Sequence, residues 1–135
     1  MKNLTAAQVL ERVRAGLSLA GAQLINLDLS GADLRNAVLA RATLLDCDLE
    51  GADLSGVILQ EARLSNCRLA RARLFETNLA GAVLAACDGT GLTCAQSVLY
   101  KTTFESGRLR GATFTDTQFG DRVILIEAEI GRAHV

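Results

Sequence analysis

The sequence predicts an all-β solenoid with square coils, and three observations lead to this prediction. From Leu19 to Leu84 every fifth residue is leucine. From Ala32 to Ala82 a short side chain (Ala, Cys, Val or Thr) stands two residues before each leucine. Outward charges of opposite sign recur twenty residues apart.

The five-residue period belongs to neither an α-helix nor a β-strand. A helix repeats its face every 3.6 residues and a strand every 2, so leucines at this spacing would spread around a helix. A chain that turns a corner every five residues closes a square coil after four corners. All the leucines then point into a narrow shaft, and position n lies beside position n+20.

The charges support this stacking independently. One predicted column alternates in sign through Asp48, Arg68, Asp88 and Arg108, and similar pairs join Asp53 to Arg73 and Arg41 to Glu61. Opposite charges on neighbouring rungs attract by about 0.2–1 kcal/mol, so they mainly fix the register. Asp28 above Asp48 breaks the alternation.

The repeating unit resembles that of the pentapeptide repeat family, whose consensus is A(D/N)LXX. Matching units begin at Ala32 (ADLRN), Ala52 (ADLSG) and Thr77 (TNLAG). The resemblance implies a right-handed quadrilateral β-helix, a solenoid whose coils contact only their neighbours. We expect it to span residues 17–126, between an N-terminal capping helix at 1–16 and a C-terminal strand or tail at 127–135.

The N-terminal segment departs from the period and predicts a short helix. Thr5 and Gln8 form a T-x-x-Q capping box, and Gly16 is placed to end the helix. Its apolar face should cover the open end of the leucine shaft, which we favour over a partner-binding role. This face consists of Val9, Leu10, Val13 and Leu17.

Two further features lie inside the repeat. Gly89 replaces a shaft leucine and Leu92 takes a small corner position, which indicates a bulge or a local change of corner geometry. Cys47, Cys67 and Cys87 lie twenty residues apart in one predicted ladder. Because a ladder does not converge as a tetrahedral zinc site requires, we favour buried free thiols over metal or redox chemistry.

Three sets of residues are candidate contacts. A cluster of four arginines, which we call the basic waist, follows an acid-rich stretch. A solvated surface is the simpler interpretation of these charges. An apolar strip runs along one predicted side, and outward apolar residues near the C-terminus suggest a homodimer through the last coils. The waist comprises Arg63, Arg68, Arg71 and Arg73; the strip comprises Val38, Ile58, Val98 and Tyr100; the dimer candidates are Val123, Leu125 and Ile126.

Composition excludes several functions. A net charge of −1 gives no electrostatic case for nucleic acid or anionic membrane as partner. No apolar run is long enough for a membrane span and no signal-peptide core begins the chain, so we expect a cytoplasmic protein, with signal-independent secretion left open. The single histidine, His134, stands in the tail, and no phosphate-binding loop is present, so we expect neither catalysis nor a cofactor.

The remaining hypotheses are non-catalytic. The favoured one is an interaction scaffold or adaptor that presents a flat β surface to a protein partner. The family resemblance implies that such repeats serve as docking modules in some bacterial secretion-associated proteins. It also implies an alternative, a DNA mimic that binds DNA gyrase and protects it from inhibitors. The arginine waist and the near-neutral charge weigh against the mimic.

Overall fold

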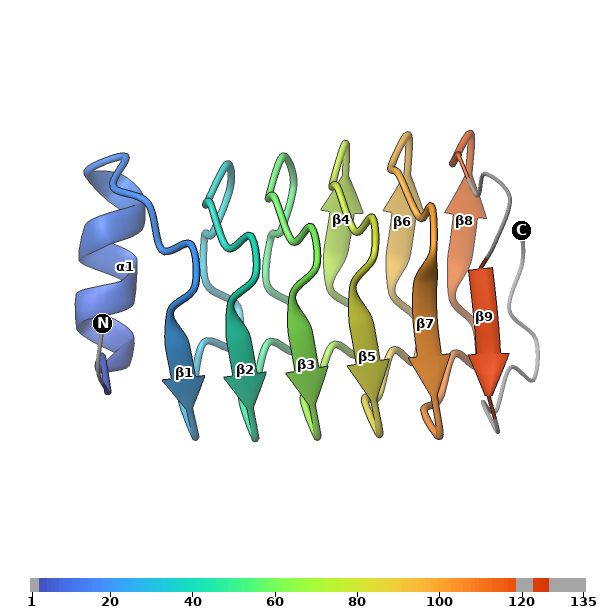
Figure 1. The fold of residues 1–135 in the computed structure, drawn as a ribbon, viewed down its shortest axis with the longest axis horizontal. Helices are drawn as coiled ribbons and strands as arrows, with labels where there is room; N and C mark the ends of the chain where they lie inside the picture. The colour runs from blue at the N-terminus through green and yellow to red at the C-terminus, as the bar shows by residue number, and fades with distance from the viewer. Residues whose placement is uncertain (1–2, 119–122, 127–135) are drawn as a thin grey trace.

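The computed structural model describes residues 3–118 and the backbone of residues 123–126, and it forms a β-solenoid with one helix at its N-terminal end (Figure 1). The coils are stacked along one axis, so the molecule is a rod. The helix is α1 (Ala6–Arg14), and the strands are β1 (Gln23–Ile25), β2 (Thr43–Leu45), β3 (Arg63–Ser65), β4 (Arg73–Phe75), β5 (Val83–Ala85), β6 (Thr93–Ala95), β7 (Thr102–Glu105), β8 (Thr113–Thr115) and β9 (Val123–Ile126).

Two sides of the rod are parallel sheets. One is six-stranded in the order β1-β2-β3-β5-β7-β9, and the other is three-stranded in the order β4-β6-β8. Outside the β7–β9 pair, partners lie twenty residues apart, as Leu24 pairs with Leu44 and Leu74 with Cys94. The other two sides stack through isolated parallel bridges, such as Asp48 with Arg68 and Val38 with Ile58. The predicted square coil is thus confirmed.

The core is the predicted leucine shaft. Central residues such as Leu24, Leu44 and Leu64 are at most 1% exposed, and the short residues two positions earlier are buried beside them. Residue identity explains the shape, because one leucine per side fills the interior and the short neighbours let adjacent walls approach. Phe104 and Phe114 take over at the C-terminal end of the shaft and meet edge to face, with ring centroids 6.4 Å apart.

Where an Asp or Asn precedes the central residue of a five-residue repeat, its side chain stabilises the turn that follows. Its side-chain oxygen accepts the backbone N–H two residues later, as Asp48 does from Glu50 and Asn78 from Ala80, both at 3.0 Å. Asp28 accepts both the N–H of Ser30 at 3.0 Å and its hydroxyl at 2.6 Å. This local turn explains why Asp28 can stand above Asp48 without a cross-rung partner.

The helix caps the N-terminal end of the shaft. The Thr5–Gln8 capping box is present, and Leu4 and Val9 are buried in the core. Gly16, with φ of 71°, follows the helix and donates its N–H to the carbonyl of Val13. The expectation that Leu17 belongs to the capping face is wrong, since Leu17 is 55% exposed. The chain has already left the helical path at Gly16.

The expected distortion at Gly89 is replaced by a local repacking. The regular pairing continues, because the Gly89 N–H donates to the Arg108 carbonyl at 2.7 Å and Asp88 bridges Arg108. A Cβ atom at Gly89 would lie 2.5 Å from Cδ2 of Leu92. The leucine at the corner therefore fills the space that the missing central side chain leaves.

The last strand changes the register. Leu125 of β9 pairs with Phe104 of β7, whereas a twenty-residue offset would bring Ile124 to that position. Gln118 still pairs with Val98 at the regular offset, so the chain gains one residue between Gln118 and β9. The expectation that Leu125 points outward requires the regular offset, whereas the observed register pairs it with the shaft residue Phe104. The side chains of Val123, Leu125 and Ile126 lie outside the described part, as do residues 127–135, so the C-terminal dimer stays a prediction.

Candidate functional site: a charged face and a neutral face

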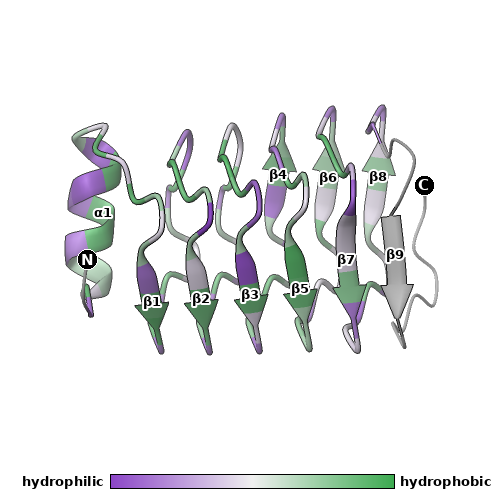
Figure 2. Ribbon diagram, in the orientation of Figure 1, coloured by the Kyte–Doolittle hydropathy of each residue, from purple (hydrophilic) through white to green (hydrophobic). Residues whose placement is uncertain are grey.

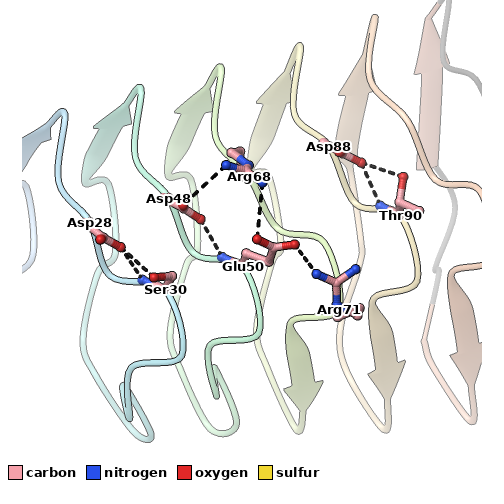
Figure 3. A network of polar contacts seen from close by, with 8 residues as sticks. All are labelled: Asp28, Ser30, Asp48, Glu50, Arg68, Arg71, Asp88 and Thr90. Atoms are coloured by element: carbon pink, nitrogen blue, oxygen red, sulfur yellow. Dashed lines mark hydrogen bonds and ion pairs between the residues drawn. The ribbon is translucent and has the colours of Figure 1, made fainter.

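One side of the rod, which we call the charged face, consists of two columns of outward residues on successive coils (Figure 3). Both columns are held by backbone pairing between coils, so their side chains are stacked at rung spacing, about 4.8 Å. The first column is Asp28, Asp48, Arg68, Asp88 and Arg108, and the second is Ser30, Glu50, Ala70, Thr90 and Arg110.

The acids of one coil pair with the arginines of the next. Arg68 lies 3.6 Å from Asp48 and 3.2 Å from Glu50, and Arg71 also pairs with Glu50. Around the corner, Arg73 lies 3.5 Å from Asp53. Three of the four arginines predicted as partner contacts thus have cross-rung partners within the chain.

The structure does not bring the four arginines onto one surface. Arg63 lies in β3 of the six-stranded sheet, Arg68 lies on the charged face with Arg71 at the adjoining corner, and Arg73 lies in β4 of the other sheet. Among the described residues, Arg63 has no ion-pair partner. The side chains of Arg68, Arg71 and Arg73 are 59%, 68% and 62% exposed, so each pair contributes only about 0–1 kcal/mol.

Hydrogen bonds lower the pKa of several surface carboxyl groups. Arg35 lowers the pKa of Asp33 to about 2, chiefly through side-chain hydrogen bonds of 2.9 and 2.8 Å. The hydroxyl and then the amide of Ser30 lower the pKa of Asp28. A general acid at neutral pH needs the opposite shift, so these groups serve the turns rather than proton transfer.

The opposite side of each coil, which we call the neutral face, carries no charged residue in its two outward columns between positions 18 and 118. Val38 and Val98 are half-buried there, and Ile58 and Tyr100 are each 37% exposed. Lys101 at the adjoining corner places its Nζ 5.1 Å from the Tyr100 ring centroid. The columns are Ser18, Val38, Ile58, Asn78, Val98 and Gln118, and Ala20, Ala40, Gln60, Ala80 and Tyr100.

Sequence reasoning missed one exposed aromatic side chain. Phe75 in β4 is 40% exposed and follows the central Leu74, a position whose side chain points outward. Its position directly after a shaft leucine could have predicted this exposure from the sequence. Figure 2 shows how hydropathy varies within the six-stranded sheet, with β5 hydrophobic along its length and β3 beginning on a hydrophilic residue.

The cysteines form a structural ladder. Cys47, Cys67, Cys87 and Cys94 are all buried and free. Cys47 donates its thiol to the Leu24 carbonyl of the preceding coil at 3.3 Å, and Cys67 and Cys87 repeat this contact. The neighbouring Cys67 thiol and burial both raise the pKa of Cys47, and burial raises that of Cys94. In contrast, a hydrogen bond with the Cys67 thiol lowers the pKa of Cys87. The protonated thiols of Cys47 and Cys94 are poor nucleophiles and poor metal ligands.

The interior offers little room for a ligand. A cavity of about 10 Å³ lies beside Gly89 and Leu92, which is space for about one water molecule. Within residues 3–118, no group of three or more His, Cys, Asp or Glu side chains could hold a metal ion. Among the described helices, none is long and apolar enough to cross a bilayer.

The repeat itself identifies the family. The family model described as "Pentapeptide repeats" matches residues 18–56, 57–88 and 77–116 with eight copies. The chain belongs to the pentapeptide repeat family. Its family membership agrees with the square coils and the leucine shaft. The resemblance stated from the units at Ala32, Ala52 and Thr77 is thus confirmed.

Solved structures of other pentapeptide repeat proteins resemble this one. HetL of the cyanobacterium Nostoc sp. strain PCC 7120, involved in heterocyst differentiation regulation, is 31% identical over 87% of this chain, with a TM-score of 0.51. The chain spans only 56% of HetL. Rfr23 of the cyanobacterium Cyanothece 51142 is 23% identical over 96% of this chain and 97% of its own, with a TM-score of 0.46.

QnrB1, a plasmid-mediated fluoroquinolone resistance protein, is more distant. It is 21% identical over 84% of this chain and 77% of its own, with a TM-score of 0.34. Identities this low indicate only that Rfr23 and QnrB1 share the repeat fold. No curated protein matches the sequence.

Proposed function

We propose that this pentapeptide repeat protein is a non-catalytic interaction scaffold of the cytoplasm, whose neutral face docks onto a protein partner. The observation that carries the proposal is the absence of charge along both columns of that face, from Ser18 to Gln118. Ile58, Tyr100 and Val98 supply apolar contact area there. A rigid shaft beneath them reduces the conformational entropy lost on binding.

Desolvation favours the neutral face over the charged face as the surface for a heterologous partner. Burying Asp48, Glu50 or Arg68 would remove their charges from water, and a partner would have to match each of them. Burying Val38 and Ile58 has no such cost and gains about 25 cal/mol for each Å² of apolar surface covered. The four waist arginines, 63, 68, 71 and 73, therefore become secondary candidates.

Two observations support a role without catalysis. The interior cavity beside Gly89 holds about one water molecule, which is too little for a substrate, and the larger hollows, of about 230–370 Å³, lie open on the surface. HetL, at 31% identity, is involved in regulating differentiation, a role that binding to another protein can fulfil. A secretion-associated docking module would also be a scaffold of this kind.

The DNA-mimic alternative is disfavoured by the ion pairs. A mimic needs an uninterrupted run of negative charge, whereas Asp48, Glu50 and Asp53 each face an arginine of the next coil. We therefore retain gyrase binding only as an outcome that the experiment must score.

The test compares two substitutions of equal exposure. Purified wild-type protein, Ile58→Asp and Leu45→Asp serve as bait in native extract, because Ile58 and Leu45 are both 37% exposed but lie on different sides. We expect the same saturable partner with wild type and Leu45→Asp, and at least tenfold weaker recovery with Ile58→Asp. Equal recovery by all three baits would contradict the neutral face, and saturable recovery of gyrase would establish the alternative.

A further inference from the structure

The charged face carries a pattern of charges that is complementary to itself. Along the rod its first column runs negative, negative, positive, negative, positive from Asp28 to Arg108. In its second column, Glu50 is negative and Arg110 is positive, while Ala70 and Thr90 between them are neutral. Figure 3 shows Asp48, Arg68 and Asp88 in line on successive coils, with Glu50 and Thr90 beside them.

We propose that the charged face binds a second copy of this chain, with the two rods antiparallel and the two-fold axis between the coils of Arg68 and Asp88. This axis keeps each column opposite itself and reverses the order of the coils. Asp48 then faces Arg108 of the second copy, Arg68 faces its Asp88, and Glu50 faces its Arg110. The symmetry repeats each pair, as an isologous interface requires.

Other two-fold arrangements in which at least four described coils meet bring like charges together. A two-fold axis at the coil of Arg68 would set Arg68 opposite Arg68 of the second copy, and Asp48 opposite its Asp88. A two-fold axis along the rod would keep the rods parallel and set Asp48 against Glu50. Like charges directly opposed are unfavourable. A two-fold axis between the coils of Asp48 and Arg68 would set Asp28 against Asp88. Among the registers in which at least four described coils meet, the charge pattern therefore selects one.

The corner column also leaves space in this register. Arg71 is the one long side chain among the corner residues Gly31, Gly51, Arg71, Gly91 and Gly111. The proposed axis places Arg71 opposite Gly91 of the second copy and Gly51 opposite its Gly111. The only bulky member of the column thus meets a residue without a side chain.

The contacts predict weak, salt-sensitive association. Four coils at about 4.8 Å span only about 20 Å, so one face buries less than the roughly 800 Å² per partner of a stable interface. The Arg68 side chain is 59% exposed, and its pairs with Asp48 and Glu50 already hold it along the face. The second copy would extend these pairs into an alternating network, which salt screens at a Debye length of about 10 Å at 0.1 M.

The test is sedimentation velocity with two charge-reversal variants. Arg108→Glu/Arg110→Glu sets acids against Asp48 and Glu50, and Asp48→Arg/Glu50→Arg sets arginines against Arg108 and Arg110. We expect wild type to dimerise at submillimolar concentration in about 0.05 M salt and to dissociate at about 0.5 M. Each variant alone should be monomeric, and an equimolar mixture should form the heterodimer, because all the reversed pairs are then opposite in sign.

The control changes the net charge as much as Arg108→Glu/Arg110→Glu does, but away from this face. Arg41→Glu/Arg63→Glu reverses two exposed arginines at a corner and in β3, and it should keep the wild-type dimer. A monomer at every salt concentration, or failure of the mixture to associate, would overturn the proposal. A dimer that resists salt and dissociates in Ile126→Asp would instead indicate the C-terminal contact. Ile58→Asp should leave this dimer unchanged, so loss of the scaffold partner and loss of the dimer are separable results.

Discussion

At the scale of single residues, the corner position two places after each central residue determines which sequences the coil accepts. It adopts positive φ throughout the described coils, for example 64° at Asn36, 69° at Gly51 and 54° at Ala86. Glycine and asparagine adopt this left-handed conformation most readily, whereas other L-residues are strained by about 1–2 kcal/mol. The positive φ of the corners thus explains why glycine is frequent there. Corner residues such as Ala86 and Arg71 adopt the same conformation with backbone strain.

Replacing a strained corner residue by glycine should stabilise the fold. Ala86→Gly removes the left-handed strain but adds backbone entropy to the unfolded chain, so we expect a net gain of about 0.5–1 kcal/mol in urea unfolding. Ala80→Gly is the matched control, because Ala80 is not among the positive-φ residues and should lose about 0.5–1 kcal/mol. Destabilisation by both substitutions would show that Ala86 is not strained.

The local hydrogen bonds of the acids predict the response to acid. A carboxyl whose pKa is lowered in the folded state adds stability above its unfolded pKa, and this stability is lost as pH falls through the folded value. Thermal stability should therefore hold down to about pH 4 and decline toward pH 2, where Asp33 titrates. An NMR titration of Asp33 gives its pKa directly, and Arg35→Ala should raise it. An ordinary pKa in the wild-type protein would contradict the Arg35 contact.

At the scale of elements, each coil is supported by its neighbours, and the first coil by α1. Val9 of α1 is 1% exposed and belongs to the same core as Leu19 and Leu24. In such a stack, stability is approximately a sum of coil terms and nearest-neighbour terms. A defect at the cap should therefore act locally.

Detaching the helix should loosen the first coil alone. Val9→Asp places a charge where the side chain is buried, so α1 should leave the shaft. We expect faster hydrogen exchange at Leu19, Leu24 and Leu29, and little change beyond Leu64. Ala7→Asp on the exposed side of the helix is the control. Uniformly faster exchange along the rod would show that the solenoid unfolds as one unit.

The repacked coil gives a second prediction at this scale. Leu92→Ala empties the space beside Gly89 and enlarges the existing cavity, so it should cost about 2–5 kcal/mol. Leu92→Met conserves volume and should cost less than about 1.5 kcal/mol. Unfolding in urea measures both, and equal losses would mean that Leu92 does not fill the gap.

At the scale of the whole molecule, the shaft and the surface contribute differently. The shaft leucines are almost fully buried, whereas the arginine side chains of the ion pairs are about 60% exposed. Buried apolar area therefore stabilises the rod, and the exposed ion pairs add little to its stability.

Removing three arginines together should cost less than removing one shaft leucine. The triple variant Arg68→Ser, Arg71→Ser and Arg73→Ser should lose no more than about 2 kcal/mol, since exposed pairs contribute little. Leu64→Ala, the comparison, should lose about 2–5 kcal/mol. Collapse of the triple variant would mean that the charge network is structural.

The repeat alone determined the coil, the shaft and the stacking offset, because a five-residue period with one inward leucine satisfies only one geometry. Tertiary structure decided what depends on neighbouring coils: Leu92 filling the space at Gly89, the exposure of Leu17 and the one-residue shift before β9. It also decided the candidate surfaces. The arginines formed one cluster in sequence, but successive residues turn corners, so they lie on different sides and most of them pair with acids from the preceding coil. Distances between side chains on adjacent coils depend on that stacking, which the order of residues in one coil does not encode.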